Sequence, residues 1–147
     1  MSTFLHSAQT SLPRAAWWLG AAGLLPFFAA PALALAQQAQ FLPAQRVYAA
    51  CILAFLGALH WGPALNGSAK KPALLLAWGV VPSLWACAAL QLPPFVQPLA
   101  LAAGLIAAMV GDLLLAPLHR WARGYLALRT VLTVGACAGL LAGFAVR

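Results

Sequence analysis

The sequence has almost no acidic residues: Asp112 is the only aspartate or glutamate among its 147 residues. Charged residues of either sign make up 6% of the chain, whereas a soluble domain carries roughly 25%. Paired carboxylates are therefore excluded, and the sequence also has no Gly-rich phosphate loop and no nucleophile with a neighbouring base. Acid–base and metal-assisted catalysis usually need such a constellation, so these absences favour a protein that is not an enzyme.

Cysteine is scarce as well. Cys51, Cys87 and Cys137 lie in three different apolar runs, and no CxxC or Cys/His spacing occurs. This pattern excludes a zinc or redox motif and is typical of small packing residues. No second histidine shares a convincing helical face at the depth of His60, so we expect neither a metal site nor a haem, and no cofactor.

Hydrophobic residues are abundant, at 65% of the chain. A soluble fold of this size could not hide so much apolar surface, because small domains leave much of their surface in water. The net charge of +7 comes from eight lysines and arginines that stand at the ends of apolar runs, which is typical of membrane topology signals. Nucleic-acid binding needs clustered phosphate contacts and is not expected; the partner that the composition indicates is the lipid bilayer.

Five apolar stretches have the length of about 20 residues that a spanning helix needs. Helices are required there, because backbone polar groups in lipid must be satisfied within the segment and no barrel-like alternation is present. The sequence therefore predicts an all-α integral membrane bundle of five transmembrane helices in one domain, residues 1–147, with spans at about 15–36, 47–65, 72–92, 96–116 and 124–146.

The basic residues also predict an orientation. With a cytoplasmic N-terminus, the cytoplasmic helix ends carry six of them and the outer ends carry two. The positive-inside rule then favours the N-terminus inside and the C-terminus outside. The inner set is Arg14, Lys70, Lys71, Arg120, Arg123 and Arg129, and the outer set is Arg46 and Arg147.

The first span has an alternative interpretation as a secretory signal peptide. Arg14 precedes an apolar core, and Ala34-Leu35-Ala36 before Gln37 is a small-residue cleavage pattern. The apolar run is longer than the 7–15 residues of a usual signal-peptide core. We therefore expect the span to be retained, with cleavage after Ala36 as the alternative.

Two spans share a Gly-x-x-Pro motif, Gly23-Leu24-Leu25-Pro26 in the first and Gly79-Val80-Val81-Pro82 in the third. Proline removes a helical hydrogen bond and bends a helix, so kinks are predicted at Pro26 and Pro82, and Ser83 is a candidate to bond its own helix backbone. Each motif is followed by a returning span with an ionisable residue, which fits a parallel repeat of two-helix units plus a fifth helix. The alternative is that the prolines only shape the packing.

Gly135, Gly139 and Gly143 lie on one face of the fifth span, where small residues let another helix approach closely. The fourth span carries Ala100, Gly104 and Ala108 at the same spacing. We expect these two faces to pack as a hairpin. The alternative is that the glycine face joins two copies of the chain.

His60, Asp112 and Arg129 come from three different spans and share one depth near the inner surface, with Trp61 and Tyr125 close by as supporting residues. Polar groups are costly in lipid, so this convergence is the candidate functional site. In a structural interpretation Asp112 pairs with Arg129 across the hairpin. In a functional one it is a proton or cation site with His60 as relay. Arg129 could instead extend to the headgroups.

The order of these motifs resembles a family of small uncharacterised multi-pass membrane proteins of proteobacteria, to which mitochondrial transmembrane protein 69 belongs. The most specific parts are Gly57-Ala58-Leu59-His60-Trp61-Gly62 in the second span and the segment Tyr125-Leu126-Ala127-Leu128-Arg129-Thr130-Val131-Leu132-Thr133 in the fifth. The resemblance runs from about Leu19 to the fifth span. It implies an inner-membrane location and a retained first span, and it implies no established activity or catalytic residue.

Three functional hypotheses follow. The first is a non-enzymatic assembly, accessory or scaffold protein that acts through helix packing, with another membrane protein or a second copy as its partner. The alternative is a small proton-linked transporter or channel-like protein that uses His60 and Asp112. A third is an enzyme or cofactor carrier for a lipid or quinone at the inner interface.

Overall fold

The chain is a bundle of helices in a computed structural model that describes residues 11–118 and 124–146. Within these ranges no β-strand forms, and the elements are α1 (Arg14–Gly23), α2 (Leu25–Leu35), α3 (Phe41–Ala58), α4 (Trp61–Leu65), α5 (Pro72–Gln91), α6 (Gln97–Leu115), the short 3₁₀ turn η1 (Ala116–Leu118) and α7 (Tyr125–Ala145). Five segments are long and apolar enough to cross a membrane: Arg14–Leu35, Phe41–Leu65, Pro72–Gln91, Gln97–Leu118 and Tyr125–Ala145. The predicted all-α fold with five spans is confirmed.

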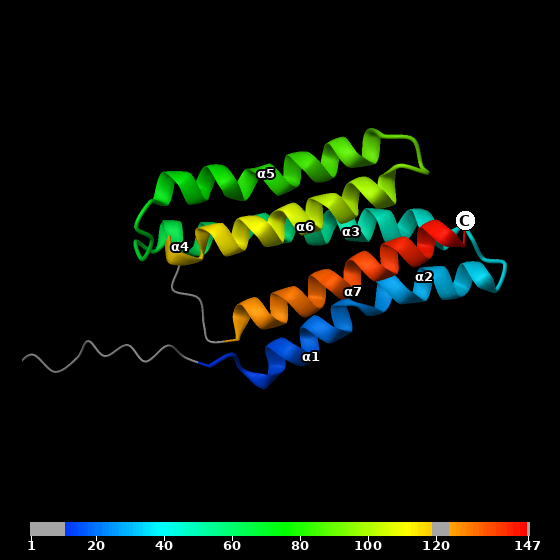
Figure 1. The fold of residues 1–147 in the computed structure, drawn as a ribbon, viewed down its shortest axis with the longest axis horizontal. Coiled ribbons are helices and arrows are strands. Elements are labelled where there is room, and N and C mark those ends of the chain that lie inside the picture. The colour runs from blue at the N-terminus through cyan, green and yellow to red at the C-terminus, as the bar shows by residue number, and fades with distance from the viewer. Residues whose placement is uncertain (1–10, 119–123, 147) are drawn as a thin grey trace, which may run out of the picture.

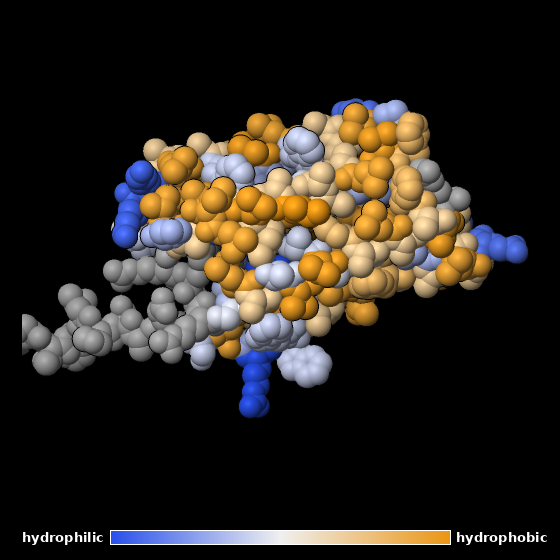
Figure 2. Space-filling view, viewed as in Figure 1, coloured by the Kyte–Doolittle hydropathy of each residue, from blue (hydrophilic) through white to orange (hydrophobic). Residues whose placement is uncertain are grey.

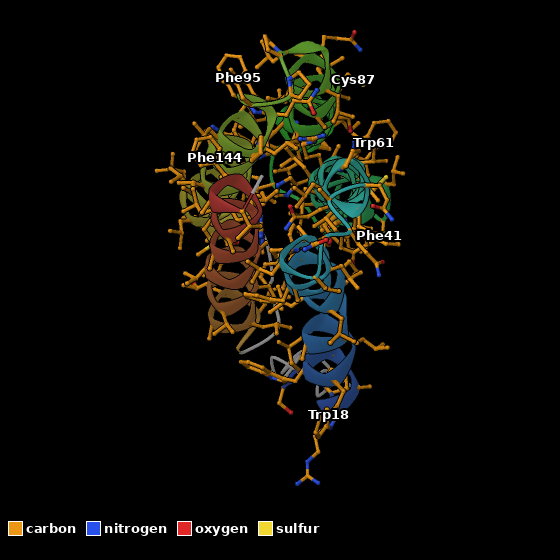
Figure 3. The ribbon with its side chains drawn as sticks, turned by 90° about the vertical axis from the view of Figure 1, so that its right-hand side faces the viewer. Trp18, Phe41, Trp61, Cys87, Phe95 and Phe144 are labelled. Atoms are coloured by element: carbon orange, nitrogen blue, oxygen red, sulfur yellow. The ribbon has the colours of Figure 1, made fainter. Side chains whose placement is uncertain are left out.

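The outer surface of the bundle is apolar between its two ends. Figure 2 shows hydrophobic residues over most of the visible face, with hydrophilic residues gathered mainly at the ends. Large side chains such as Trp18 and Phe95 point away from the helices (Figure 3), and Trp18 is 77% exposed. Such a surface is unfavourable in water and matches the hydrocarbon interior of a bilayer.

Helix α3 is the centre of the bundle. It contacts α2, α5, α6 and α7, and Figure 1 shows α5 and α6 on one side of the molecule and α7, α2 and α1 on the other. Alanine and leucine residues of these helices form the core together with Phe27, chiefly Ala49, Leu53, Leu101, Leu105 and Leu140. The starts of α1, α5 and α7 and the end of α6 lie at one end of the bundle (Figure 1).

The second span begins at Phe41 rather than at about residue 47, because the polar Gln45 is used inside the bundle. Gln45 is 2% exposed, and its Nε2 donates to the carbonyl oxygen of Phe27 at 2.7 Å and to that of Gly139 at 2.8 Å. Pro31 has no N–H with which to bond the Phe27 carbonyl four residues earlier. The Gln45 amide supplies that missing donor and joins α2, α3 and α7.

The first span is interrupted at Leu24, and Pro26 lies in the first turn of the second half, α2. The free carbonyl of Gly23 accepts a hydrogen bond of 2.9 Å from the Tyr48 hydroxyl. In contrast, α5 runs through Pro82 without interruption. The two Gly-x-x-Pro motifs therefore have different backbone conformations, because only the first proline lies at a helix start.

The glycine face of α7 packs against a different helix from the one predicted. A Cβ atom at Gly135 would meet Leu24, one at Gly139 would meet Phe27, and one at Gly143 would meet Gln45. The helices α6 and α7 are neighbours, as the 3.8 Å contact between Cys137 Sγ and the Ala102 carbonyl shows. Their pairing does not use the glycine face, however, so the expectation that this face meets the fourth span is wrong.

Gly139 and Gly143 are buried within their own chain, so this face is already covered in the structure. The close helix approach that glycine permits occurs elsewhere as well. A Cβ atom at Gly57 of α3 would collide with the carbonyl oxygen of Gly79 in α5. Gly104 of α6, in turn, faces Trp85 and Leu53, and not the fifth span.

Candidate functional site

The candidate site is formed by three helical elements at the end of the bundle where α6 ends and α7 begins. His60 lies between α3 and α4, at the point where the second span is interrupted. Asp112 lies three residues before the end of α6, and Arg129 lies four residues after the start of α7. At 1.5 Å per residue, Asp112 and Arg129 are each about 5–6 Å inside their helix ends.

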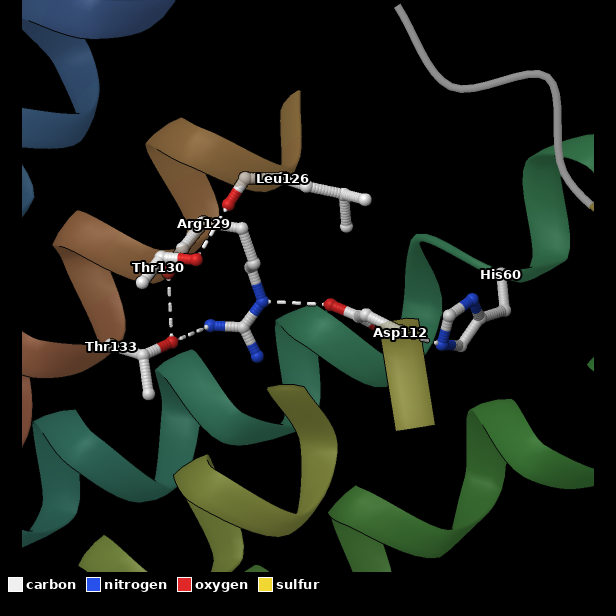
Figure 4. Close-up of polar contacts among 6 residues, drawn as sticks. All are labelled: His60, Asp112, Leu126, Arg129, Thr130 and Thr133. Carbon is white, nitrogen blue, oxygen red and sulfur yellow. Dashed lines mark hydrogen bonds and ion pairs between the residues drawn. The ribbon is translucent and has the colours of Figure 1, made fainter. Parts of the chain in front are cut away.

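The three side chains form a buried ionic cluster (Figure 4). Arg129 Nε donates to Asp112 Oδ2 at 2.8 Å, and His60 Nε2 lies 3.1 Å from Asp112 Oδ1. The residues are 4%, 1% and 2% exposed for Arg129, His60 and Asp112. Each oxygen of the only carboxylate thus has a partner from a different span. We call His60, Asp112 and Arg129 the polar cluster.

Thr133 completes the arginine side of the polar cluster and was not among the predicted residues. Arg129 Nη1 donates to Thr133 Oγ1 at 2.6 Å, and Thr133 Oγ1 donates to the Arg129 carbonyl at 2.9 Å. The signal that points to it is its position four residues after Arg129, one turn along the same helix face. Arg129 Nη2 is buried and has no acceptor among the described residues.

The supporting residues have different positions. Tyr125 is half-buried at the start of α7, close enough for its hydroxyl to interact with Asp112 and Arg129. Trp61 is 42% exposed and packs on Gly79 of α5. Ser83 is half-buried on α5, and no described contact joins it to the polar cluster. Tyr125 is thus the supporting residue that the geometry brings to the cluster.

The polar cluster combines the two contacts that the sequence offered as competing interpretations. Arg129 does not extend to the headgroups, because it is 4% exposed and bonded to Asp112; that alternative is wrong. With a neutral imidazole, Asp112 and Arg129 balance each other's charge. An ionised carboxylate only accepts hydrogen bonds, so His60 Nε2 is then the donor.

The chemistry that these side chains offer is hydrogen bonding and proton exchange. No group of three His, Cys, Asp or Glu residues that could hold a metal ion occurs in the described part of the chain. Cys51 and Cys87 are exposed on the lipid-facing surface, and Cys137 is half-buried on α7. The titratable pair that a proton could use is His60 and Asp112.

The comparisons with known proteins agree with this architecture. Residues 12–145 match the family described as "Protein of unknown function (DUF3429)". The chain is also 37% identical over 142 residues to Transmembrane protein 69 of Xenopus tropicalis, an alignment that covers 91% of this chain and 55% of that relative. The chain thus spans about half the length of that relative. No solved structure matches it. A family match over nearly the whole chain and five membrane-spanning helices lead to one conclusion: the chain belongs to the DUF3429 family and is a multi-pass membrane protein.

Proposed function

We propose that the chain is a non-enzymatic assembly, accessory or scaffold protein of the bacterial inner membrane, and that it acts through helix packing with another membrane protein. The observation that carries the proposal is that the polar cluster is bonded within the bundle on both sides of its carboxylate. Both oxygens of the only carboxylate are bonded within the bundle. The charged groups of the membrane interior therefore serve to hold helices together.

The bonds of the polar cluster join three spans that are far apart in the sequence. Asp112 of α6 binds Arg129 of α7 on one side and His60, at the end of α3, on the other. Removing one partner of a buried pair costs about 3–5 kcal/mol. Such a cluster fixes the register and rotation of the helices. A bundle held in this way presents a fixed outer surface, which supports a protein that contacts its partner through that surface.

Native electrophoresis of membranes with and without the gene tests the proposal. We expect one membrane complex to lose mass or disappear when the chain is absent, and to return when the wild-type chain is supplied. If every complex is unchanged by the deletion, the accessory role is contradicted.

The proposed orientation has the N-terminus inside and the C-terminus outside. Arg14, Lys70 and Lys71 are exposed at the same end of the bundle as the start of α7, and positive residues favour the cytoplasmic side. Three of the basic residues on which the predicted orientation rests lie outside the described residues: Arg120, Arg123 and Arg147. A reporter fused to the C-terminus that is active only outside the cytoplasm should be active, and a cytoplasmic reporter there should be inactive.

A second candidate function is a small proton-linked transporter or channel-like protein. The observation that favours it is the 3.1 Å contact between His60 and Asp112, because an ionisable pair inside a membrane span is a feature of proton relays. Purified protein in vesicles with an imposed pH gradient tests it. A proton flux that disappears with Asp112→Asn supports this candidate and contradicts the accessory role.

A further inference from the structure

A cavity of about 440 Å³ lies between the first span, α3 and α7. It forms because the first span is interrupted at Leu24. Beyond the break, α2 packs against both α3 and α7, whereas α1 contacts α7 and α2 and makes no close backbone approach to α3. The break therefore leaves a slot between α1 and α3, and its volume is within the range of about 300–1,000 Å³ of ligand sites.

The walls of this slot are almost entirely apolar. They include Leu19, Leu24, Phe55, Leu56, Leu128 and Leu132, and Arg129 is the charged residue among the lining residues. Water is a poor occupant, because a buried water needs two to four polar partners. An empty space of this size would forfeit the dispersion contacts of its walls. A hydrocarbon chain from the bilayer satisfies both conditions.

The length of the slot indicates what kind of hydrocarbon occupies it. Its lining extends from Ala16 to Phe27 on the first span and from Tyr125 to Ala136 on α7. Each stretch is about 16 Å long at 1.5 Å per residue. One leaflet is half of the hydrocarbon core of about 30 Å. The slot therefore has the depth of one acyl chain, whereas a partner helix would have to cross both leaflets.

The charge near the Ala16 end of the slot indicates the headgroup, although Arg14 itself is not among the lining residues. Arg14 is exposed at the start of α1, two residues before Ala16, and Leu12 lies beside Gly124 at the start of α7. Trp17 and Trp18 are also exposed there, and tryptophan is enriched at the headgroup level. Apart from Asp112, which is bonded within the polar cluster, the chain has no acidic residue to repel an anion.

We infer that this slot binds one acyl chain of an anionic phospholipid, with the headgroup phosphate at Arg14 and the chain between α1, α3 and α7. The site does not depend on the proposed accessory role. It gives the protein a specific lipid from the leaflet at the Arg14 end of the bundle. The occupied slot fills the space between α1 and α3, whose backbones do not approach closely.

Native mass spectrometry of the purified chain tests the inference. The protein is taken from nanodiscs of equal parts phosphatidylglycerol and phosphatidylcholine, washed in detergent, and its retained phospholipids are counted. We expect one phospholipid per chain, with phosphatidylglycerol preferred about fivefold, the effect of one basic residue near a membrane surface. No retained phospholipid, an equal share of the two lipids, or a neutral isoprenoid in their place contradicts the inference.

One matched pair of variants and a third variant locate the site. Ala16→Trp fills the slot and should reduce the retained lipid to background, whereas Ala15→Trp, on the exposed side of the same helix, should keep it. Leu59→Trp fills the slot from the residue that follows α3 and should act like Ala16→Trp, so one unstable variant does not decide the outcome. Equal loss in Ala15→Trp and Ala16→Trp contradicts the assigned location.

The headgroup is tested separately. Arg14→Gln should abolish the preference for phosphatidylglycerol while one phospholipid is still retained. Lys71→Gln, at the same end of the bundle but next to α5, which contributes nothing to the lining, should keep the preference. If Lys71→Gln lowers the preference as much as Arg14→Gln, the charge acts as a general surface field and the assigned phosphate position is wrong.

Discussion

Replacing Asp112 by asparagine and Arg129 by glutamine in the same chain should cost much less stability than the two single changes added together. In the Asp112→Asn protein, a guanidinium that is 4% exposed faces a neutral amide. In the Arg129→Gln protein, the carboxylate loses its cationic partner and keeps its contact with His60. Each single change leaves an uncompensated buried charge and is expected to cost about 3–5 kcal/mol.

The double variant buries no net charge and should therefore cost about as much as one single variant. The resulting coupling energy is about 3–5 kcal/mol, at or above the upper end of the range for residues in contact. Unfolding of the four proteins in mixed micelles, at increasing mole fractions of denaturing detergent, measures it. Circular dichroism and tryptophan fluorescence should report the same transition, since a free energy of unfolding is well defined only when unfolding is two-state.

A second double-mutant cycle, between Arg14 and Asp112, provides the control. Arg14 is exposed at the start of α1 and has no contact with the polar cluster, so Arg14→Gln and Asp112→Asn should be additive within about 0.3–0.5 kcal/mol. A coupling below about 0.5 kcal/mol between Asp112 and Arg129 would refute the buried ion pair as the contact that holds α6 to α7.

Three further predictions concern the packing. Gln45→Leu should lower stability by about 1–3 kcal/mol because two buried carbonyls lose their donor; in a Pro31→Ala background the loss should be smaller, since residue 31 then supplies an N–H, and equal losses in both backgrounds would contradict the assignment. Gly57→Ala should lower the thermal midpoint in detergent, because its Cβ collides with the Gly79 carbonyl, whereas Gly62→Ala, which has nothing within 4 Å, should leave it unchanged; equal shifts would count against the α3–α5 approach. Mass spectrometry of the purified protein should find the first span present, because Phe27 packs in the core, and a chain that starts at Gln37 would show the opposite.

Hydropathy predicted the five spans because the membrane requires long apolar helices. It also predicted that the polar cluster converges, since a single carboxylate at one depth has few partners that can neutralise it. The predicted start of the second span, at about residue 47, is too late, because it leaves the polar residues Gln45 and Arg46 outside the helix. The signal that could have corrected this is Pro31, which leaves a carbonyl in the first span that needs a donor from another helix.

The partner of the glycine face could not be predicted from spacing alone. A four-residue period identifies a face of α7 but not the helix that it meets, and that choice depends on how all five spans pack together. The slot between α1 and α3 was not predicted either. It follows from the break at Leu24, whereas the same Gly-x-x-Pro motif in α5 continues as one helix. Local sequence therefore did not distinguish a break from a continuous helix.

Proton flux in vesicles is the most direct test of the central claim, that the polar cluster holds helices together and does not carry protons. Purified wild-type protein is reconstituted with a pH-sensitive dye inside, and a pH gradient and a membrane potential are imposed in turn. We expect a proton flux equal to that of protein-free vesicles. A flux above that level in the wild type that is lost in Asp112→Asn, with Arg14→Gln still active, would contradict it.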